Sequence, residues 1–196
     1  MKKPKFFYRY LFLTFLLLPF HASLATTVKP FNLSQMTGNA DKIFRAEVIA
    51  VKTGAINVGG GELSTTIYTL RVNDLIKGQL SKQSGKINNI IELQMVGSQK
   101  KPSAENGLRN VGGFRTPKLI TGNEYLLFTT PPSSIGLSMT VGVGQGLFSF
   151  KDGSLVRNEF NNVGLFRGMA SSVDFPSQGP VDYNTLVQQI ESLISE

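Results

Sequence analysis

The chain has 196 residues, of which 41% are hydrophobic and 17% charged, with a formal net charge of +7. It contains no cysteine and no tryptophan, and its one histidine is His21. If residues 1–25 are a removable signal, the remaining chain has neither cysteine nor histidine. That composition excludes Ser-His-Asp and Cys-His catalytic systems, and zinc or haem sites built on histidine or cysteine.

The N-terminus has the pattern of a secretory signal. Residues 1–9 are basic, residues 10–20 are apolar, and Ser23 and Ala25 are small residues at the positions that a signal peptidase reads. The apolar run is shorter than the roughly 20 residues of a membrane-spanning helix. We therefore expect cleavage after Ala25 and an exported protein, periplasmic or extracellular, with no stable membrane insertion. An uncleaved N-terminal anchor is the alternative.

The mature chain is expected to be one domain, residues 26–196. Cleavage removes four basic residues and no acidic one, which lowers the net charge from +7 to +3. Nucleic-acid binding needs a clustered basic surface, and the sequence has none, so no nucleic-acid partner is predicted. Without disulfides the fold depends on its hydrophobic core, and a domain of this length buries roughly 70% of its unfolded surface.

The first half of the mature chain predicts a short helix followed by strands. After an extended lead-in over 26–31, Asn32 or Ser34 caps a helix that closes at Gly38. Apolar residues at consecutive positions predict a strand over 43–51 that is buried on both faces. The glycines at 59–61 indicate a flexible loop over 53–64. Further strands are expected over 66–72, 87–96, 124–130, 139–150 and 155–159.

The C-terminal segment predicts an amphipathic helix over 182–196. Asp182 is its expected cap. One apolar stripe is expected to contain Leu186, Val187, Ile190, Leu193 and Ile194. A hairpin turn is expected over 151–154, and residues 160–179 show no clear period. The element order predicts a mainly β fold, a small, closed or nearly closed antiparallel barrel with the C-terminal helix packed on it.

Three stretches resemble a known module. Residues 39–48, 68–72 and 75–78 read NADKIFRAEV, YTLRV and LIKG. Within residues 39–78 the chain resembles the OB-fold module of tissue inhibitors of metalloproteinases (TIMP-like) and related netrin-like modules. It also looks like uncharacterised exported bacterial proteins with a glycine-rich strand like residues 141–148. The resemblance implies an OB-like barrel and a protein partner, with an exported metalloprotease as one candidate.

The chain departs from those inhibitors at its mature N-terminus. The inhibitors grip the protease zinc through the amine and carbonyl of an N-terminal cysteine that disulfides hold in place. Here the expected terminus is Thr26-Thr27, which offers an amine and a carbonyl but no disulfide. The fold is therefore carried over more readily than the inhibitory chemistry. Thr26 and Thr27 are candidate partner-binding residues.

Two patterns that suggest catalysis or phosphate binding have simpler interpretations. The glycines at 142, 144 and 146 precede a strand rather than a helix, which indicates a bend or a close backbone approach instead of a phosphate loop. No spacing pairs the acidic residues for acid–base chemistry, and Asp41 is expected to pair with Lys42 or Arg45. No catalytic, cofactor or metal residue is predicted. The carboxylates considered are Asp41, Glu47, Asp74, Glu92 and Glu124.

Two other segments are candidates for interfaces. The polar segment 97–116 contains Lys100-Lys101, Arg109, Phe114 and Arg115, and arginine and aromatic residues are common interface anchors. A solvated loop is the alternative. Residues 160–167 could form a lid over the end of the barrel or an exposed apolar patch. We expect instead that Phe160 and Phe166 pack in the core.

The sequence thus predicts an exported, non-enzymatic module that binds a protein or peptide. The candidate surfaces are the 97–116 segment, the 59–61 loop and an exposed strand edge, where strand addition supplies main-chain hydrogen bonds. The alternative is a structural or surface-assembly component of the bacterial cell envelope, which the glycine and asparagine content and weak charge fit. An enzyme built on carboxylates or a Ser-Lys pair is a third hypothesis.

Overall fold

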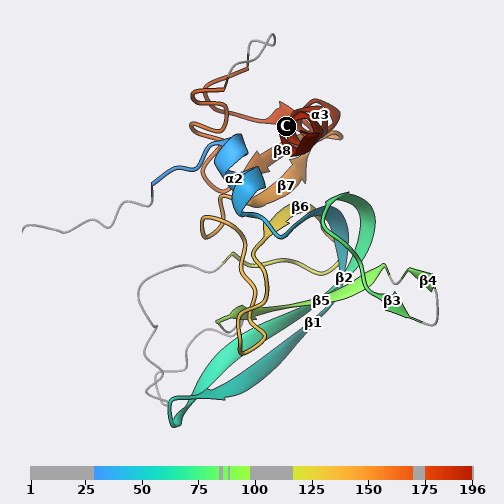
Figure 1. The fold of residues 1–196 in the computed structure, drawn as a ribbon, viewed down its shortest axis with the longest axis vertical. Helices are drawn as coiled ribbons and strands as arrows, with labels where there is room; N and C mark the ends of the chain where they lie inside the picture. The colour runs from blue at the N-terminus through green and yellow to red at the C-terminus, as the bar shows by residue number, and fades with distance from the viewer. Residues whose placement is uncertain (1–28, 84–85, 88, 98–116, 170–174, 196) are drawn as a thin grey trace, which may run out of the picture.

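A computed structural model describes residues 29–83, 86–87, 89–97, 117–169 and 175–195. These residues form a mainly β protein with a seven-stranded antiparallel sheet, a two-stranded ribbon and two helices (Figure 1). The strands, in their order across the sheet, are β5 (Ile90–Val96), β2 (Gly61–Lys77), β1 (Lys42–Val58), β6 (Glu124–Thr129), β7 (Leu147–Lys151), β8 (Leu155–Asn158) and β9 (Val181–Asp182). The ribbon is β3 (Lys82–Gln83) with β4 (Lys86–Ile87), and the helices are α2 (Leu33–Asn39) and α3 (Tyr183–Ser195).

The strands β1 and β2 are each 17 residues long, much longer than the sequence predicts. They are joined by Gly59 and Gly60, with φ of 59° and 81°. Positive φ at both central residues is what the two-residue hairpin turn of type I′ requires. The prediction of a flexible loop over 53–64 is therefore wrong, because these polar residues pair across the hairpin in continuous register.

The sheet carries a hydrophobic core on each face, and β1 contributes to both. Ile43 lies in the helix-side core, which α2 and α3 cover, whereas Phe44, Ala46 and Val48 lie in the second core on the other face. The prediction that this strand is buried on both faces is right only in part, because Ile43 is buried on the helix-side face, whereas Arg45 and Glu47 on that face are partly exposed. The helix-side core includes Leu33, Met36, Leu126, Phe128, Phe148, Leu186 and Ile190, and the second core includes Tyr68, Leu70, Leu93, Met95, Tyr125 and Leu127.

Side-chain caps begin both helices. Asn32 accepts a hydrogen bond from the N–H of Gln35 at 2.8 Å, and the Gln35 side chain accepts one from the N–H of Asn32 at 3.1 Å. Asp182 accepts from the N–H of Thr185 at 2.9 Å. These contacts confirm Asn32 and Asp182 as caps, since each satisfies a backbone donor that the first helical turn leaves unpaired. Leu186 and Ile190 are buried and Val187 and Leu193 partly buried, which confirms most of the predicted apolar stripe, whereas Ile194 is 42% exposed.

The predicted strand over 139–150 is mostly wrong. Only Leu147–Lys151 forms β7, and residues 141–146 form turns. Gly142 and Gly144 have φ of 65° and 97°, which interrupts an extended chain. Likewise the strand expected over 87–96 begins as β5 only at Ile90. The hairpin from β7 to β8 forms as predicted, with Gly153 at φ 75° in its turn.

The sheet does not close within the described residues, so the predicted barrel is not confirmed. β5 and β9 stand at its two edges. The chain between β6 and β7 reaches across to β5, where the N–H of Ser138 donates to the carbonyl of Gln94 at 2.9 Å. None of the helices in the described ranges is long and apolar enough to span a membrane. The predicted signal, residues 1–25, lies outside those ranges.

Candidate functional site

The partner-binding residues predicted from the sequence lie outside the described residues, and the structure does not test them. These are Thr26, Thr27, Arg109, Phe114 and Arg115, together with Lys100-Lys101. Of the predicted surfaces, the structure describes the glycine turn at 59–61 and the strand edges. The glycine turn is the tip of the arm, the name used here for residues 51–68 of β1 and β2, which extends away from both helices (Figure 1).

The arm has an edge on β1 with no neighbouring strand in the described residues. β6 pairs with β1 only over Lys42–Glu47. The last backbone bonds on that side join Val48 to Asn123 at 3.0 Å and Gly122 to Val48 at 2.8 Å. From Val51 to Val58, β2 is the only strand among the described residues that pairs with β1. This stretch, residues 51–58, is called the open edge.

The hairpin register fixes which residues face the open edge. Val58 and Gly61 flank the two-residue turn and form the hydrogen-bonded pair that closes it. Hydrogen-bonded and non-hydrogen-bonded pairs alternate along an antiparallel ladder. The backbone groups that face outward therefore belong to Val51, Thr53, Ala55 and Asn57.

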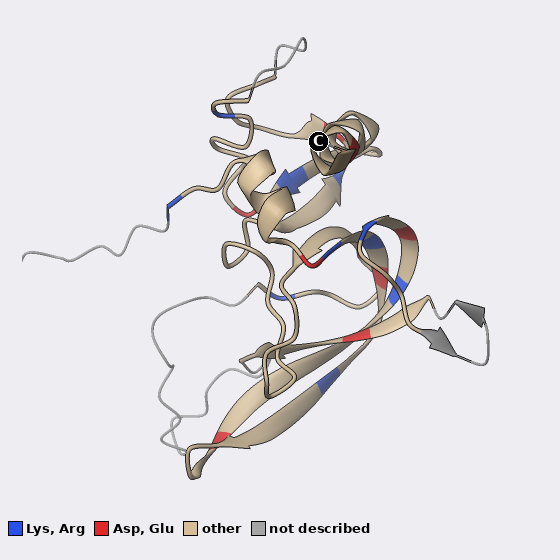
Figure 2. Cartoon of the chain, viewed as in Figure 1, with Lys and Arg blue, Asp and Glu red and all other residues tan. Residues whose placement is uncertain are grey.

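The open edge lacks the usual protection against pairing with another chain. Proteins protect exposed edges with proline, charged side chains or bulges. Residues 51–58 contain no proline and one charged residue, Lys52, and the register irregularities of β1 all lie between Ile43 and Ala50. Figure 2 shows the arm mostly free of charged residues. An extended polypeptide could therefore add to this edge through main-chain hydrogen bonds.

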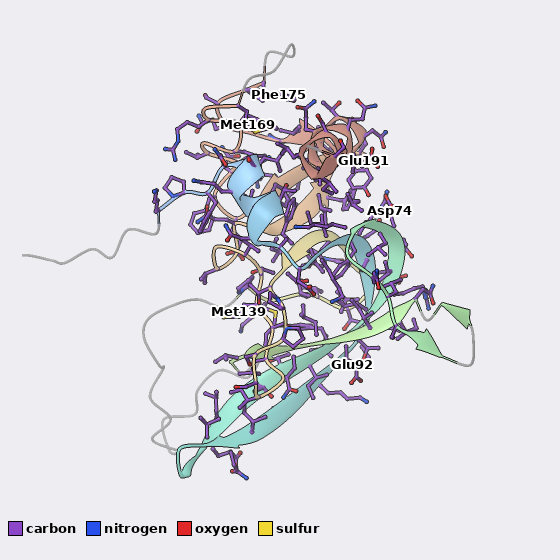
Figure 3. The ribbon with its side chains drawn as sticks, in the orientation of Figure 1. Asp74, Glu92, Met139, Met169, Phe175 and Glu191 are labelled. Atoms are coloured by element: carbon purple, nitrogen blue, oxygen red, sulfur yellow. The ribbon has the colours of Figure 1, made fainter. Side chains whose placement is uncertain are left out.

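A polar cluster lies where β1, β2, β6 and α3 meet. Arg45 donates to Glu124 at 2.6 Å, and Asn73 donates to the other oxygen of the same carboxylate at 2.7 Å. The hydroxyl of Tyr183 donates to Asp74 at 2.7 Å (Asp74 is labelled in Figure 3). These contacts tie the start of α3 and the end of β2 to the centre of the sheet.

Aromatic rings complete the surroundings of Arg45. Its guanidinium carbon lies 4.6 Å from the ring centroid of Phe150 and 5.0 Å from that of Tyr183, within the range of cation–π attraction. The hydrogen bond from Arg45 lowers the pKa of Glu124, and the same bond raises the pKa of Arg45. Burial, followed by the bond to Asp74, raises the pKa of Tyr183. Arg45 and Glu124 compensate each other's charge, and the hydrogen bond between Tyr183 and Asp74 holds the start of α3 against β2.

Two of the carboxylates considered in the sequence, Glu47 and Glu124, lie opposite each other as register partners on β1 and β6, and Asp74 belongs to the same polar cluster as Glu124. Asp41 pairs with Lys42, as predicted, and Glu47 pairs with Arg71 at 3.0 Å. Glu92 is exposed on β5, away from Asp74 (Figure 3). In the parts of the chain that the structure describes, no group of three histidine, cysteine or acidic residues could hold a metal ion.

The segment after β8 differs from its prediction. Phe160, expected in the core, is 43% exposed, because it lies in a turn where Asn161 and Asn162 adopt positive φ of 54° and 57°. Phe166 packs partly against the helix-side core, and its ring stacks on Phe175 with centroids 3.9 Å apart. The expectation of core packing is therefore wrong for Phe160 and right in part for Phe166.

Sequence patterns did not single out Gln145, a buried residue that holds the start of the described chain. Its side-chain oxygen accepts from the N–H of Phe31 at 2.6 Å, and its side-chain nitrogen donates to the carbonyl of Lys29 at 3.1 Å. Gly142 lies against Phe31, where an added Cβ would be 2.9 Å from the ring. The expected close backbone approach is confirmed at Gly146, where an added Cβ would lie 3.0 Å from the carbonyl oxygen of Val141 and 3.1 Å from that of Phe128. The contacts that Gln145 makes with the chain at Lys29 and Phe31 were not predicted.

Comparisons of the sequence with protein-family models and with curated proteins find no match. The resemblance of residues 39–78 to netrin-like modules therefore stays a prediction.

Proposed function

We propose that the protein is an exported, non-enzymatic binding module that takes an extended segment of a partner protein along the open edge. The observation that carries this proposal is the long arm, whose β1 edge has no neighbour among the described residues from Val51 onward. Export itself rests on the signal pattern of residues 1–25.

The open edge offers enough main-chain groups for specific but modest binding. Four outward-facing residues present four N–H donors and four carbonyl acceptors. Each backbone hydrogen bond contributes roughly 0.5–1.5 kcal/mol net. Association costs at least about 4 kcal/mol in lost freedom of motion, so side-chain contacts must supply part of the affinity. Exposed Thr53, Ala55 and Asn57 are the positions where a partner would meet side chains.

The resemblance suggests which fold and which partner to consider. β6 returns beside β1 after the consecutive strands β1, β2 and β5, which is the Greek-key order. An OB fold is a partly open Greek-key barrel, so this order supports the proposal of an OB-like module. An exported metalloprotease is the partner that the resemblance implies, with the expected Thr26 amine as a further contact to examine.

The test is a crosslinked pull-down from the native envelope fraction with residues 26–196 as bait. Thr53→Pro removes one outward N–H and leaves the β1–β2 ladder intact, because proline is tolerated at edges where its N–H is not used. Thr53→Ala, the matched control, keeps that N–H. We expect wild-type bait and Thr53→Ala to capture the same dominant protein, and Thr53→Pro to lose it.

Two outcomes would contradict the proposal. Capture that is equal for Thr53→Pro and wild type would exclude the open edge as the binding surface. Recovery of the bait alone, with self-association that grows with concentration, would favour the alternative of an envelope assembly component. A captured metalloprotease would justify inhibition kinetics, beginning with variants of Thr26.

A further inference from the structure

The segment Lys29–Asn32, here called the strap, is held almost entirely through its main chain. Besides the two bonds to Gln145, the carbonyl of Pro30 accepts from Arg167 at 3.2 Å. The side chain of Asn32 returns a bond to the carbonyl of Arg167 at 2.9 Å. Gln145 and Arg167 together are called the clamp.

The clamp binds main-chain groups of the strap, much as a neighbouring strand in a sheet would. A single buried amide, Gln145, bonds the carbonyl of Lys29 and the N–H of Phe31, two residues apart. Gln145 is 4% exposed, and its own carbonyl accepts from Asn158 at 2.9 Å, which fixes its position. Such contacts bind any extended chain whose main-chain groups fit.

Two residues of the strap, Pro30 and Phe31, indicate which side chains the clamp would accept in a bound segment. Phe31 packs on the helix-side core in the space that Gly142 leaves open, because a Cβ there would lie within 2.9 Å of the ring. Pro30 has no N–H, so nothing at that position is left unpaired when its carbonyl is bound. The site therefore suits an extended segment in which an aromatic residue follows proline.

We propose that the clamp is a peptide-binding site for extended polypeptide segments with a proline-aromatic pair, and that the strap is its resident, exchangeable ligand. The side-chain anchors of the strap are the partly buried ring of Phe31 and the amide of Asn32, whereas Lys29 is exposed and Pro30 is only partly buried. An empty clamp would leave the buried Gln145 amide without the two partners that it has here, which is unfavourable for a buried polar group. Replacement by another segment removes that cost. This inference does not depend on the open edge or on the proposed function.

The test uses the full mature chain, residues 26–196, with the strap weakened by Phe31→Ala. The probe is a fluorescein-labelled peptide of residues 26–32, TTVKPFN. We expect saturable binding to Phe31→Ala, at least ten-fold tighter than to the wild-type chain, whose own strap is present at an effective concentration in the millimolar range. In the Phe31→Ala background, adding Gln145→Leu should weaken the binding at least ten-fold, and replacing Phe by Ala in the peptide should do the same.

Equal binding with and without Gln145→Leu would overturn the proposal, as would absence of binding to a folded Phe31→Ala chain. Thermal unfolding reports whether that variant folds. If that variant does not fold, amide hydrogen exchange of the wild-type chain tests instead whether the strap leaves the clamp. The amide of Phe31 should exchange faster than that of Leu126 in β6, because the strap opens without global unfolding. Exchange of both amides at one rate would make the strap a fixed part of the core and refute the inference.

Discussion

The side-chain nitrogen of Lys77 donates a 2.7 Å hydrogen bond to the carbonyl of Ala40, 37 residues earlier in the chain. The same nitrogen donates to the carbonyl of Thr37 at 2.6 Å. One ammonium group at the end of β2 thus binds the carbonyls at the C-terminal end of α2, where a positive charge is favourable. The separate stretches NADK and LIKG meet at this point, which gives the motif residues a structural role.

Replacing Lys77 by methionine should lower the free energy of unfolding by about 1–2 kcal/mol, because two carbonyls lose a charged donor while the apolar stem is kept. Urea unfolding of both proteins measures the change. Lys52→Met on the exposed arm is the control, expected to stay within about 0.5 kcal/mol of wild type. Equal effects of the two substitutions would show that Lys77 does not stabilise the end of α2.

Gly78→Ala should be more destabilising than Gly122→Ala, although both glycines have similar positive φ, 90° and 82°. An added Cβ at Gly78 would lie 2.8 Å from the carbonyl of Asp41, whereas at Gly122 nothing lies within 4 Å. Both substitutions introduce the strain of a positive φ, so the difference between their losses of stability measures the steric contact between residue 78 and the backbone of Asp41. We expect it to exceed about 1 kcal/mol in urea unfolding. Identical losses would mean that the chain relaxes freely around Gly78.

Glu124→Gln should reduce stability at neutral pH and flatten its acid dependence. Because the pKa of Glu124 is lowered in the folded state, the carboxylate stabilises the protein above its unfolded pKa, near 4.5, and this stability is lost as the pH falls through the folded pKa. We expect a loss of roughly 1 kcal/mol at pH 7, a modest value because the pair is partly solvated. Urea unfolding between pH 7 and 3 measures both effects, and parallel curves for the two proteins would contradict the prediction.

Tyr183→Phe should remove a loss of stability at high pH. The pKa of Tyr183 is raised in the folded state, so its contribution is fully present below the unfolded pKa of 10.0 and decreases as the pH rises above it. The variant also loses the bond to Asp74, worth about 1 kcal/mol. The melting temperature should fall less between pH 8 and pH 11 for the variant than for the wild-type protein. An unchanged difference would mean that Tyr183 does not couple to the fold in this range.

Local signals predicted local structure well. The caps Asn32 and Asp182 and the burial of Leu186 and Ile190 follow from residue type and spacing alone. The burial of β1 on both faces was predicted only in part, because Arg45 and Glu47 are partly exposed. The length of the arm did not follow, because residues 53–57 and 62–64 have little apolar periodicity, and pairing across Gly59-Gly60 holds them extended. Phe160 was misplaced because the positive φ of two asparagines turns the chain outward.

The candidate sites were predictable only in part. An exposed strand edge could be anticipated, but its position depends on where β6 stops pairing with β1, which no local pattern encodes. Gln145 was missed because its partners, Lys29 and Phe31, are more than 100 residues away. A polar residue among glycines gives no sign of such a long-range contact.

Residue-resolved amide hydrogen exchange of residues 26–196 tests the open edge most directly. In the free protein the amides of Lys52, Gly54 and Ile56, bonded to β2, should exchange slowly, whereas those of Val51, Thr53, Ala55 and Asn57 should exchange fast. A bound partner should protect the second set and leave the first unchanged. Protection of the second set in the free protein, or no change in it when the captured partner binds, would contradict the account.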